Sequence, residues 1–117
     1  MGCRVLIIED DVELRSMMDA ILANDGFEPL TASNGRDALQ ALQGGADPQV
    51  IILDLMMPVM DGWQFRRALR HYPRLWGIPT VIVSALSNPN VSELQPAAVL
   101  CKPVNVDELM HVVHMCC

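Results

Sequence analysis

The sequence lacks any long hydrophobic run, although 51% of its 117 residues are hydrophobic. No apolar stretch approaches the roughly 20 residues that a membrane-spanning helix needs. The first apolar run stops at Glu9 after four residues, so we expect no signal peptide. A myristoylation signal beginning at Gly2 would need Ser or Thr at the position of Leu6. These absences favour a cytoplasmic protein that makes no contact with membranes.

Basic residues are also scarce. Eight Lys and Arg stand against 14 Asp and Glu, which leaves a formal net charge of −6. This negative charge disfavours binding to phosphate backbones, so we expect no direct contact with nucleic acids. Four arginines do cluster in one segment, at Arg66, Arg67, Arg70 and Arg74. The simplest interpretation of this cluster is the solvated face of a helix.

The four cysteines lack the CxxC spacing of metal and redox motifs, and two of them, Cys116 and Cys117, are adjacent. This arrangement argues against a disulfide framework, so we expect reduced thiols. His111 and His114 precede them and are three residues apart. The amphipathic pattern of a helix explains that spacing more simply than a metal site does.

Short apolar runs alternate with stretches of helical periodicity along the chain. The strong runs, rich in β-branched residues, cover residues 5–8, 50–53, 80–83 and 98–101, and a weak one covers 28–32. Such runs indicate buried strands. Strands that alternate with helices imply right-handed βαβ crossovers and a parallel sheet covered on both faces. We therefore predict one domain, residues 1–117, with a doubly wound, three-layer α/β fold.

One segment, residues 86–96, departs from this rhythm. It contains Pro89 and Pro96 and has only weak helical periodicity. Proline disrupts the interior of a helix. We therefore expect a short or irregular fourth helix, of about a single turn near residues 91–94.

Polar residues follow the four strong runs, at the point where each predicted strand ends. They are Glu9-Asp10, Asp54, Ser84 and Lys102. In an open parallel sheet, ligands bind at the carboxyl ends of the strands. Each residue alone has a simpler structural explanation, since acids often cap helices as Asp11 is expected to do. Their joint occurrence at four strand ends favours a chemical site in one crevice.

Carboxylates gathered at one edge repel one another, and a divalent cation relieves that repulsion. Mg²⁺ prefers hard oxygen ligands, which Asp10, Asp54 and a backbone carbonyl just past Asp54 could supply, with Glu9 acting through water. Lys102 could pair with Asp54 and then with a phosphoryl oxygen, and Ser84 could donate a hydrogen bond to another. The set predicts that Asp54 accepts a phosphoryl group and forms an acyl phosphate.

Nearly the whole chain resembles the receiver domain of two-component response regulators. The motifs that carry the resemblance are Val-Leu-Ile-Ile-Glu-Asp-Asp at 5–11, Asp-Leu-Met-Met-Pro-Val-Met-Asp-Gly at 54–62, Val-Ser-Ala at 83–85 and Lys102-Pro103. Asn34-Gly35 followed by Ala38-Leu39 also fits the start of the family's second helix. The stretch at 54–62 is highly specific.

The resemblance implies a flavodoxin-like, five-stranded sheet in the order 2-1-3-4-5. It implies that Asp54 takes a phosphoryl group from the phosphohistidine of a sensor histidine kinase or a histidine phosphotransfer protein. Asp10 would bind Mg²⁺ directly, Glu9 would bind it through water, and Met56 would contribute its backbone carbonyl. Such a domain is not an enzyme beyond its own phosphotransfer and autodephosphorylation.

The resemblance also gives roles to the two remaining site residues. Ser84 would be the hydroxyl that moves toward the phosphoryl group, and Lys102 its ion-pair partner. The Lys102-Pro103 peptide bond would be cis. Leu86, two residues past Ser84, would shield the path of the attacking water, which implies slow dephosphorylation.

Two features depart from the family pattern. Val99 stands three residues before the lysine, where the family usually has an aromatic residue that swings inward. The interval from Ser84 to Lys102 is shorter than usual and contains two prolines. We therefore expect a working site beside an unusual output face, which in the family is built from the fourth helix, fifth strand and fifth helix.

Three other functions remain open from the residues. An Asp-nucleophile, Mg²⁺-dependent phosphohydrolase would need a second acid where Met56 stands. A flavin-binding electron carrier would need a phosphate-binding loop where Glu9 and Asp10 follow the first strand. A receiver-like scaffold that works without phosphorylation agrees with Val99 but not with the intact set of acids, hydroxyl and amine.

Overall fold

A parallel five-stranded sheet forms the centre of the computed structural model, which describes residues 2–117. The strand order is β2-β1-β3-β4-β5, which confirms the predicted order. The strands are β1 (Arg4–Ile8), β2 (Glu28–Ala32), β3 (Val50–Asp54), β4 (Thr80–Ser84) and β5 (Ala98–Cys101).

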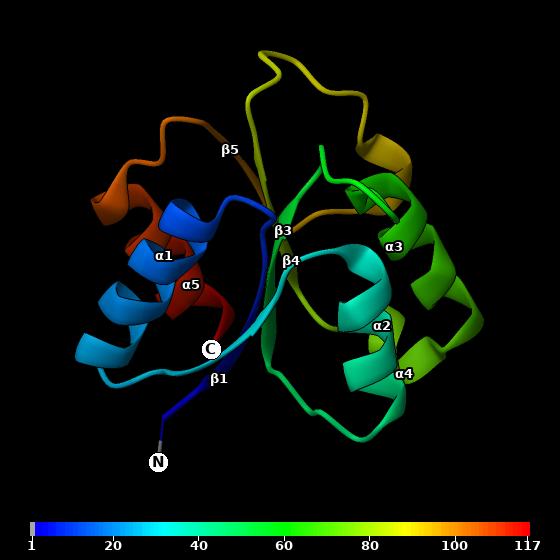
Figure 1. Cartoon of the computed structure of the whole chain (residues 1–117), viewed down its shortest axis with the longest axis horizontal. Helices are drawn as coiled ribbons and strands as arrows, with labels where there is room; N and C mark the ends of the chain where they lie inside the picture. Colours follow the sequence, from blue (N-terminus) through cyan, green and yellow to red (C-terminus); the bar gives the residue numbers. More distant parts are fainter. Residues whose placement is uncertain (1) are drawn as a thin grey trace.

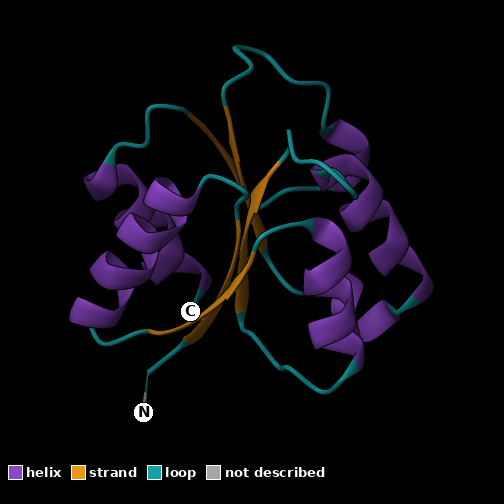
Figure 2. Cartoon of the chain, viewed as in Figure 1, coloured by secondary structure: helices purple, strands orange, loops and turns teal. Residues whose placement is uncertain are grey.

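Helices cover both faces of this sheet, as the strand–helix alternation predicts (Figure 1, Figure 2). On one face lie α1 (Val12–Asn24) and α5 (Val106–Cys116). On the other face lie α2 (Gly35–Gln43), α3 (Gly62–Ala68) and α4 (Pro73–Trp76). None of the helices within residues 2–117 is long and apolar enough to cross a membrane.

The central strands supply two hydrophobic cores, one on each face of the sheet. Along β1, Val5 and Ile7 belong to the core beneath α1 and α5, whereas Leu6 and Ile8 belong to the core beneath α2 and α3. A strand turns successive side chains to opposite faces, so a continuous apolar run serves both cores. A one-residue slip would exchange the two sets, and the register is therefore strongly specified.

Side-chain caps begin the helices that follow the strands. Asp11 Oδ1 accepts hydrogen bonds from the backbone N–H groups of Glu13 and Leu14, as expected for the start of α1. Asp61 forms a reciprocal capping box with Gln64 at the start of α3. These bonds satisfy backbone donors that a helix leaves unpaired in its first turn.

Gly62 allows α3 to begin directly against the end of β3. A Cβ atom at this position would lie 2.5 Å from the backbone oxygen of Asp54 and 2.7 Å from Cα of Leu55. The Gly62 backbone N–H donates to the carbonyl of Leu55 at 2.9 Å. A larger residue would displace the backbone that carries Asp54.

The third helix is shorter than the apolar spacing of Phe65, Ala68, Leu69 and Tyr72 predicts. It ends at Ala68 and continues as the 3₁₀ helix η1 (Leu69–His71), after which Pro73 begins the separate turn α4. Tyr72 has a non-helical backbone, with φ −131° and ψ 88°, because proline disfavours the helical conformation in the residue before it. Proline suits the first position of a new helix. Pro73 was the sequence signal for α4.

The segment between β4 and β5 contains one short 3₁₀ helix, η2 (Ser92–Leu94), within residues 85–97. This confirms the prediction of a short, irregular element near residues 91–94. Arg66 Nε donates to the carbonyl of Leu94 at 2.9 Å, and Arg70 donates to the carbonyl of Glu93. Arg67 forms an ion pair with the carboxylate of Glu93 at 2.9 Å. The arginines of α3 and η1 thus hold η2 in place.

The expected solvated face of this arginine cluster is therefore wrong for Arg66, which is 3% exposed. Its guanidinium also donates to the carbonyl of Trp76 at 2.9 Å and stacks 3.7 Å from the Trp76 ring. Burial, together with the nearby charge of Arg70, lowers the pKa of Arg66 to about 10. The spacing of the arginines could be read from the sequence, but the carbonyl groups that the Arg66 side chain contacts could not.

The expectation that all thiols are reduced is also wrong in this structure. A disulfide joins Cys3 and Cys117, whereas Cys101 and Cys116 are free. Cys3 lies just before β1 and Cys117 just after α5, and both ends of the chain lie at the same end of the molecule (Figure 1). The Cα atoms are 6.1 Å apart, within the range that a disulfide spans. The pair was hidden because the cysteines are 114 residues apart in sequence.

Candidate functional site

The polar residues that follow the strands gather at one edge of the sheet. Glu9 and Asp10 follow β1, Asp54 ends β3, Ser84 ends β4, and Lys102 follows β5. All strand pairs are parallel, and the register places Asp54 beside Val83 and Ser84 beside Cys101. The Lys102-Pro103 peptide bond is cis, as the resemblance predicts. This edge is opposite the end of the molecule that carries the disulfide.

Three acids form the centre of the site. One carboxylate oxygen from each of Glu9, Asp10 and Asp54 lies within 4.8 Å of the others. Within residues 2–117, this is the only group of three or more acidic, His or Cys residues with such closely placed ligand atoms. Glu9 is 1% exposed and Asp54 is 2% exposed, whereas Asp10 is open to solvent. Two buried acids and one exposed acid give a site that is accessible from one side.

Lys102 places its ammonium group against the two buried acids. Its Nζ lies 2.9 Å from Oε1 of Glu9 and 3.4 Å from Oδ1 of Asp54. The side chain is 23% exposed, so the ion pairs are only partly screened by water. Burial alone lowers the pKa of Lys102, but the carboxylates of Glu9 and Asp54 outweigh burial and raise it. Lys102 therefore stays charged.

Asp54 keeps one oxygen without a hydrogen bond. Its Oδ1 accepts a bond from the backbone N–H of Met56 at 3.3 Å. Its Oδ2 is buried and has no hydrogen-bond donor among residues 2–117. A buried, unsatisfied carboxylate oxygen is costly and needs an explanation. Burial, and then the neighbouring Glu9, raise the pKa of Asp54 to about 7 despite the opposing charge of Lys102.

Ser84 is fully buried at the end of β4. Its Oγ accepts a hydrogen bond from the backbone N–H of Leu86 at 3.0 Å, and its carbonyl accepts one from the N–H of Lys102 at 2.8 Å. Ser84 is thereby tied to both the following loop and the lysine. Leu86 is partly exposed at the rim, as is the side chain of Met56.

Two contacts that the sequence pattern did not predict hold Glu9 in position. The guanidinium of Arg15 donates to the carbonyl of Glu9 at 2.8 Å, and the backbone N–H of Asp11 donates to Glu9 Oε2 at 3.2 Å. Arg15 lies on the first turn of α1 that follows the Asp11 cap. The position of Arg15 one helical turn after the Asp11 cap is the sequence feature that could have indicated this contact.

A cavity lies beside the site. Leu55, Met56, Pro58 and Trp63 line a cavity of about 320 Å³, and the Trp63 indole donates to the carbonyl of Asn90 at 3.1 Å.

On the edge strand β5, the side chain of Val99 is exposed, and no α-helix in residues 85–97 covers it. Between β4 and β5, the described residues therefore lack the α-helix that belongs to the family's usual output face.

The sequence profile of the response regulator receiver domain matches residues 5–114. The transcriptional regulatory protein TcrA of Mycobacterium tuberculosis is 32% identical over 112 residues, which cover 92% of this chain and 43% of TcrA. The regulatory protein AtoC of Escherichia coli is 34% identical over 115 residues, which cover 94% of this chain and 24% of AtoC. The chain thus spans less than half the length of these curated relatives.

Solved structures agree in fold over nearly the whole chain. The chemotaxis response regulator CheY4 of Vibrio cholerae superposes with a TM-score of 0.91 at 29% identity and covers 100% of both chains. The response regulator TrrA of Thermotoga maritima, in complex with Mg(2+)-BeF, gives a TM-score of 0.86 at 26% identity and covers 98% of this chain and 99% of that chain. The profile match, these relatives and the sheet with its acidic carboxyl edge lead to one conclusion: the chain belongs to the receiver domains of two-component response regulators.

Proposed function

We propose that residues 1–117 form a single phosphoacceptor domain in which Asp54 receives a phosphoryl group from a phosphohistidine. The donor would be a sensor histidine kinase or a histidine phosphotransfer protein in the cytoplasm. The observation that carries the proposal is the buried Asp54 carboxylate, which has an oxygen without a donor in residues 2–117 and lies beside two further acids and an ammonium group.

The donor set fits a magnesium ion. The carboxylates of Glu9, Asp10 and Asp54 are hard oxygen ligands, and the unsatisfied Oδ2 of Asp54 would gain a partner. We propose that Asp10, Asp54 and the backbone carbonyl of Met56 hold the ion directly and that Glu9 holds it through water. The ion would offset the negative charge of the incoming phosphoryl group. TrrA, the structural relative in complex with Mg(2+)-BeF, supports this part of the proposal.

The transfer itself needs few groups from the protein. The Asp54 carboxylate forms a new P–O bond while the P–N bond to the partner's histidine breaks, and the histidine nitrogen keeps the electron pair of that bond. Lys102 moves from its carboxylate partners to a phosphoryl oxygen. The hydroxyl of Ser84, which already lies at the end of β4, donates to another phosphoryl oxygen.

Hydrolysis of the acyl phosphate, in which the phosphoryl group passes to water, would be the domain's only other reaction. We propose that Leu86 slows it, because this apolar side chain follows the Ser84 hydrogen bond at the rim of the site. The net negative charge supports the proposal that the domain does not bind nucleic acid or membranes itself. Its signal would pass to a downstream protein target or a fused output domain.

Phosphorylation by a small donor tests the proposal. The protein is incubated with acetyl phosphate and Mg²⁺, and its intact mass is measured. We expect a gain of one phosphoryl group that is absent in Asp54→Asn and absent when the metal is chelated. Asp107→Asn, which removes an exposed carboxylate at the start of α5, is the matched control and keeps the gain.

Two outcomes would contradict the proposal. Continuous release of phosphate from many organic phosphomonoesters would indicate a phosphohydrolase. No mass gain with any donor, in a protein that remains folded, would indicate a scaffold that works without phosphorylation.

A further inference from the structure

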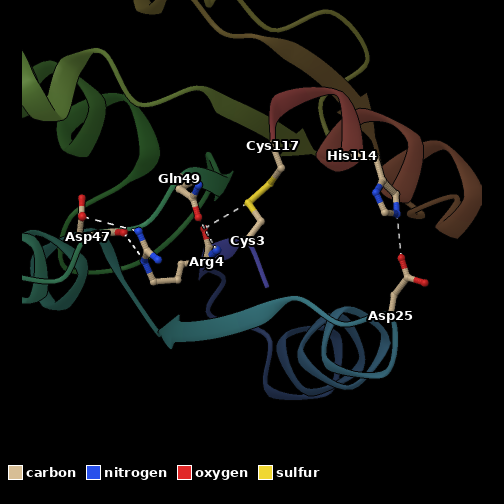
Figure 3. Close-up of a disulfide and its surroundings, with 7 residues drawn as sticks. All are labelled: Cys3, Arg4, Asp25, Asp47, Gln49, His114 and Cys117. Atoms are coloured by element: carbon tan, nitrogen blue, oxygen red, sulfur yellow. Dashed lines mark hydrogen bonds and ion pairs between the residues drawn. A yellow bond between two sulfur atoms is a disulfide. The ribbon is translucent and has the colours of Figure 1, made fainter. Parts of the chain in front are cut away.

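We infer that Cys3 and Cys117 form a redox-controlled latch that holds the end of α5 against the start of β1. The disulfide lies at the end of the molecule opposite the acidic site, and Figure 3 shows it between β1 and the last turn of α5. The latch would act independently of phosphorylation. Its two states are the disulfide seen here and a pair of free thiols.

Val113 and the partly buried Cys116 pack the last turn of α5 against the core, but beyond Val113 the turn has few polar contacts. His114 Nε2 lies 2.8 Å from Oδ2 of Asp25, and the His114 ring packs 4.9 Å from the ring of Phe27 (Figure 3 shows the His114–Asp25 pair). Both members of the His114–Asp25 pair are about half exposed. Exposed pairs of this kind contribute little to stability. The disulfide is therefore the main constraint on the residues that follow Val113, apart from the packing of Cys116.

The fold does not need the disulfide to form its core. Leu109 and Val113 of α5 are fully buried against β1, β3 and β4, together with Val5 and Ile52. A domain of this length buries enough apolar surface to fold without a covalent staple. Opening the disulfide would release the end of α5 beyond Val113 while the buried part of the helix stays docked. This combination distinguishes a latch from a structural disulfide.

The positions of the four cysteines select this pair. Cys117 is exposed and Cys3 is partly buried, so both can be reached by small thiols and disulfides. Cys116 is partly buried in the core beneath α5, and burial raises the pKa of its thiol. A raised pKa leaves less thiolate for exchange. Cys101 lies at the carboxyl end of β5, at the opposite edge of the sheet from Cys3.

The latch closes by thiol–disulfide exchange with a low-molecular-weight disulfide. The Cys117 thiolate attacks one sulfur of that disulfide, and a mixed disulfide forms as one small thiolate leaves. The Cys3 thiolate then attacks the Cys117 sulfur and expels the second small thiolate. The two protein thiols are oxidised, and the small disulfide is reduced to two thiols. A dithiol reductant reverses both steps.

The test compares the same protein after treatment with oxidised glutathione and after treatment with dithiothreitol. Alkylation followed by intact mass should count two free thiols in the first state and four in the second, and peptide mapping should find the Cys3–Cys117 link. In the reduced state, we expect the backbone amides of residues 114–117 to exchange hydrogen about tenfold faster. The amides of β3 should be unchanged.

Single variants separate the latch from simpler explanations. Cys117→Ser and Cys3→Ser should each behave as the reduced protein in both buffers, while Cys116→Ser keeps the full response. Asp54→Asn should also keep it, since the latch does not depend on the proposed phosphorylation. A link through Cys116 or between two chains, or equal exchange in both states, would overturn the inference. Unfolding of both Cys3→Ser and Cys117→Ser, judged by circular dichroism, would also overturn it and show a structural disulfide.

Discussion

The ammonium of Lys102 lies closer to Glu9 than to Asp54, at 2.9 Å from Oε1 of Glu9 and 3.4 Å from Oδ1 of Asp54. Lys102 is therefore shared between the acid proposed as the acceptor and the acid proposed to hold the metal through water. A phosphoryl group on Asp54 would attract the ammonium away from Glu9. The ammonium of Lys102 thus lies near the Asp54 carboxylate without being bound to it alone.

Lys102→Met removes the one ammonium group that faces both buried acids. Without metal, at pH 8, we expect this change to lower the free energy of unfolding by about 3 kcal/mol, because it leaves two buried carboxylates without a countercharge. Urea unfolding in chelator measures the effect. Lys102→Arg, the control, keeps the charge and should lose much less. Equal stability of Lys102→Met and the parent protein would contradict the assigned ion pairs.

The raised pKa of Asp54 predicts how stability depends on pH. Burial and Glu9 raise this pKa from 3.8 to about 7, so the folded state binds a proton that the unfolded state releases. The contribution of Asp54 to stability therefore falls as the pH rises from 3.8 to about 7, and the full cost is present above that range.

Asp54→Asn tests this dependence, because an amide does not titrate. In chelator, urea midpoints of Asp54→Asn should exceed those of the parent protein by more at pH 8 than at pH 5. Added Mg²⁺ should stabilise the parent more at pH 8, where the carboxylate is ionised. A difference between the two proteins that does not change with pH would contradict the raised pKa.

The arginine that holds η2 gives a prediction about stability. Arg66→Met keeps much of the apolar stem but removes the donor from the buried bond to the Leu94 carbonyl and from the partly buried bond to the Trp76 carbonyl, which should cost about 2–4 kcal/mol. Arg67→Met is the matched control on the same helix. It breaks only the half-exposed pair with Glu93 and should cost less than about 1 kcal/mol. Chemical unfolding compares the two, and equal losses would contradict the role of Arg66.

The sheet could be predicted from the sequence because each strand is marked by a short apolar run of neighbouring residues. The apolar runs at 5–8, 50–53 and 80–83 each mark a buried strand, and the polar residue that ends each run lies at the carboxyl edge in any parallel arrangement. The strand order came from the resemblance, and the structure confirms it.

The missed features depend on distant partners. Arg66 is buried only because it meets Leu94, which is 28 residues away, and Cys3 meets Cys117 only after the whole sheet has formed. Charge spacing and cysteine spacing carry no information about such contacts. The separate turn α4 was missed for a local reason, because the apolar spacing that continues to Tyr72 conceals the helix boundary that Pro73 imposes.

The lifetime of the phosphorylated state should depend on Leu86. Leu86→Asn places an amide at the rim, where it can orient a water toward the acyl phosphate, so we expect dephosphorylation to become several-fold faster. Decay of the phosphorylated mass after removal of the donor measures this rate. Leu86→Met preserves an apolar side chain and should decay like the parent. Equal decay of Leu86→Asn and the parent would show that Leu86 does not shield the site.

Locating the phosphoryl group along the chain tests whether Asp54 is the acceptor. After incubation with acetyl phosphate and Mg²⁺, borohydride reduction converts an aspartyl phosphate to homoserine, and peptide mass spectrometry identifies the altered residue. We expect homoserine at position 54 and at no other acid. Homoserine at position 10 or elsewhere with Asp54 intact, or no conversion in a folded and metal-loaded protein, would contradict this expectation.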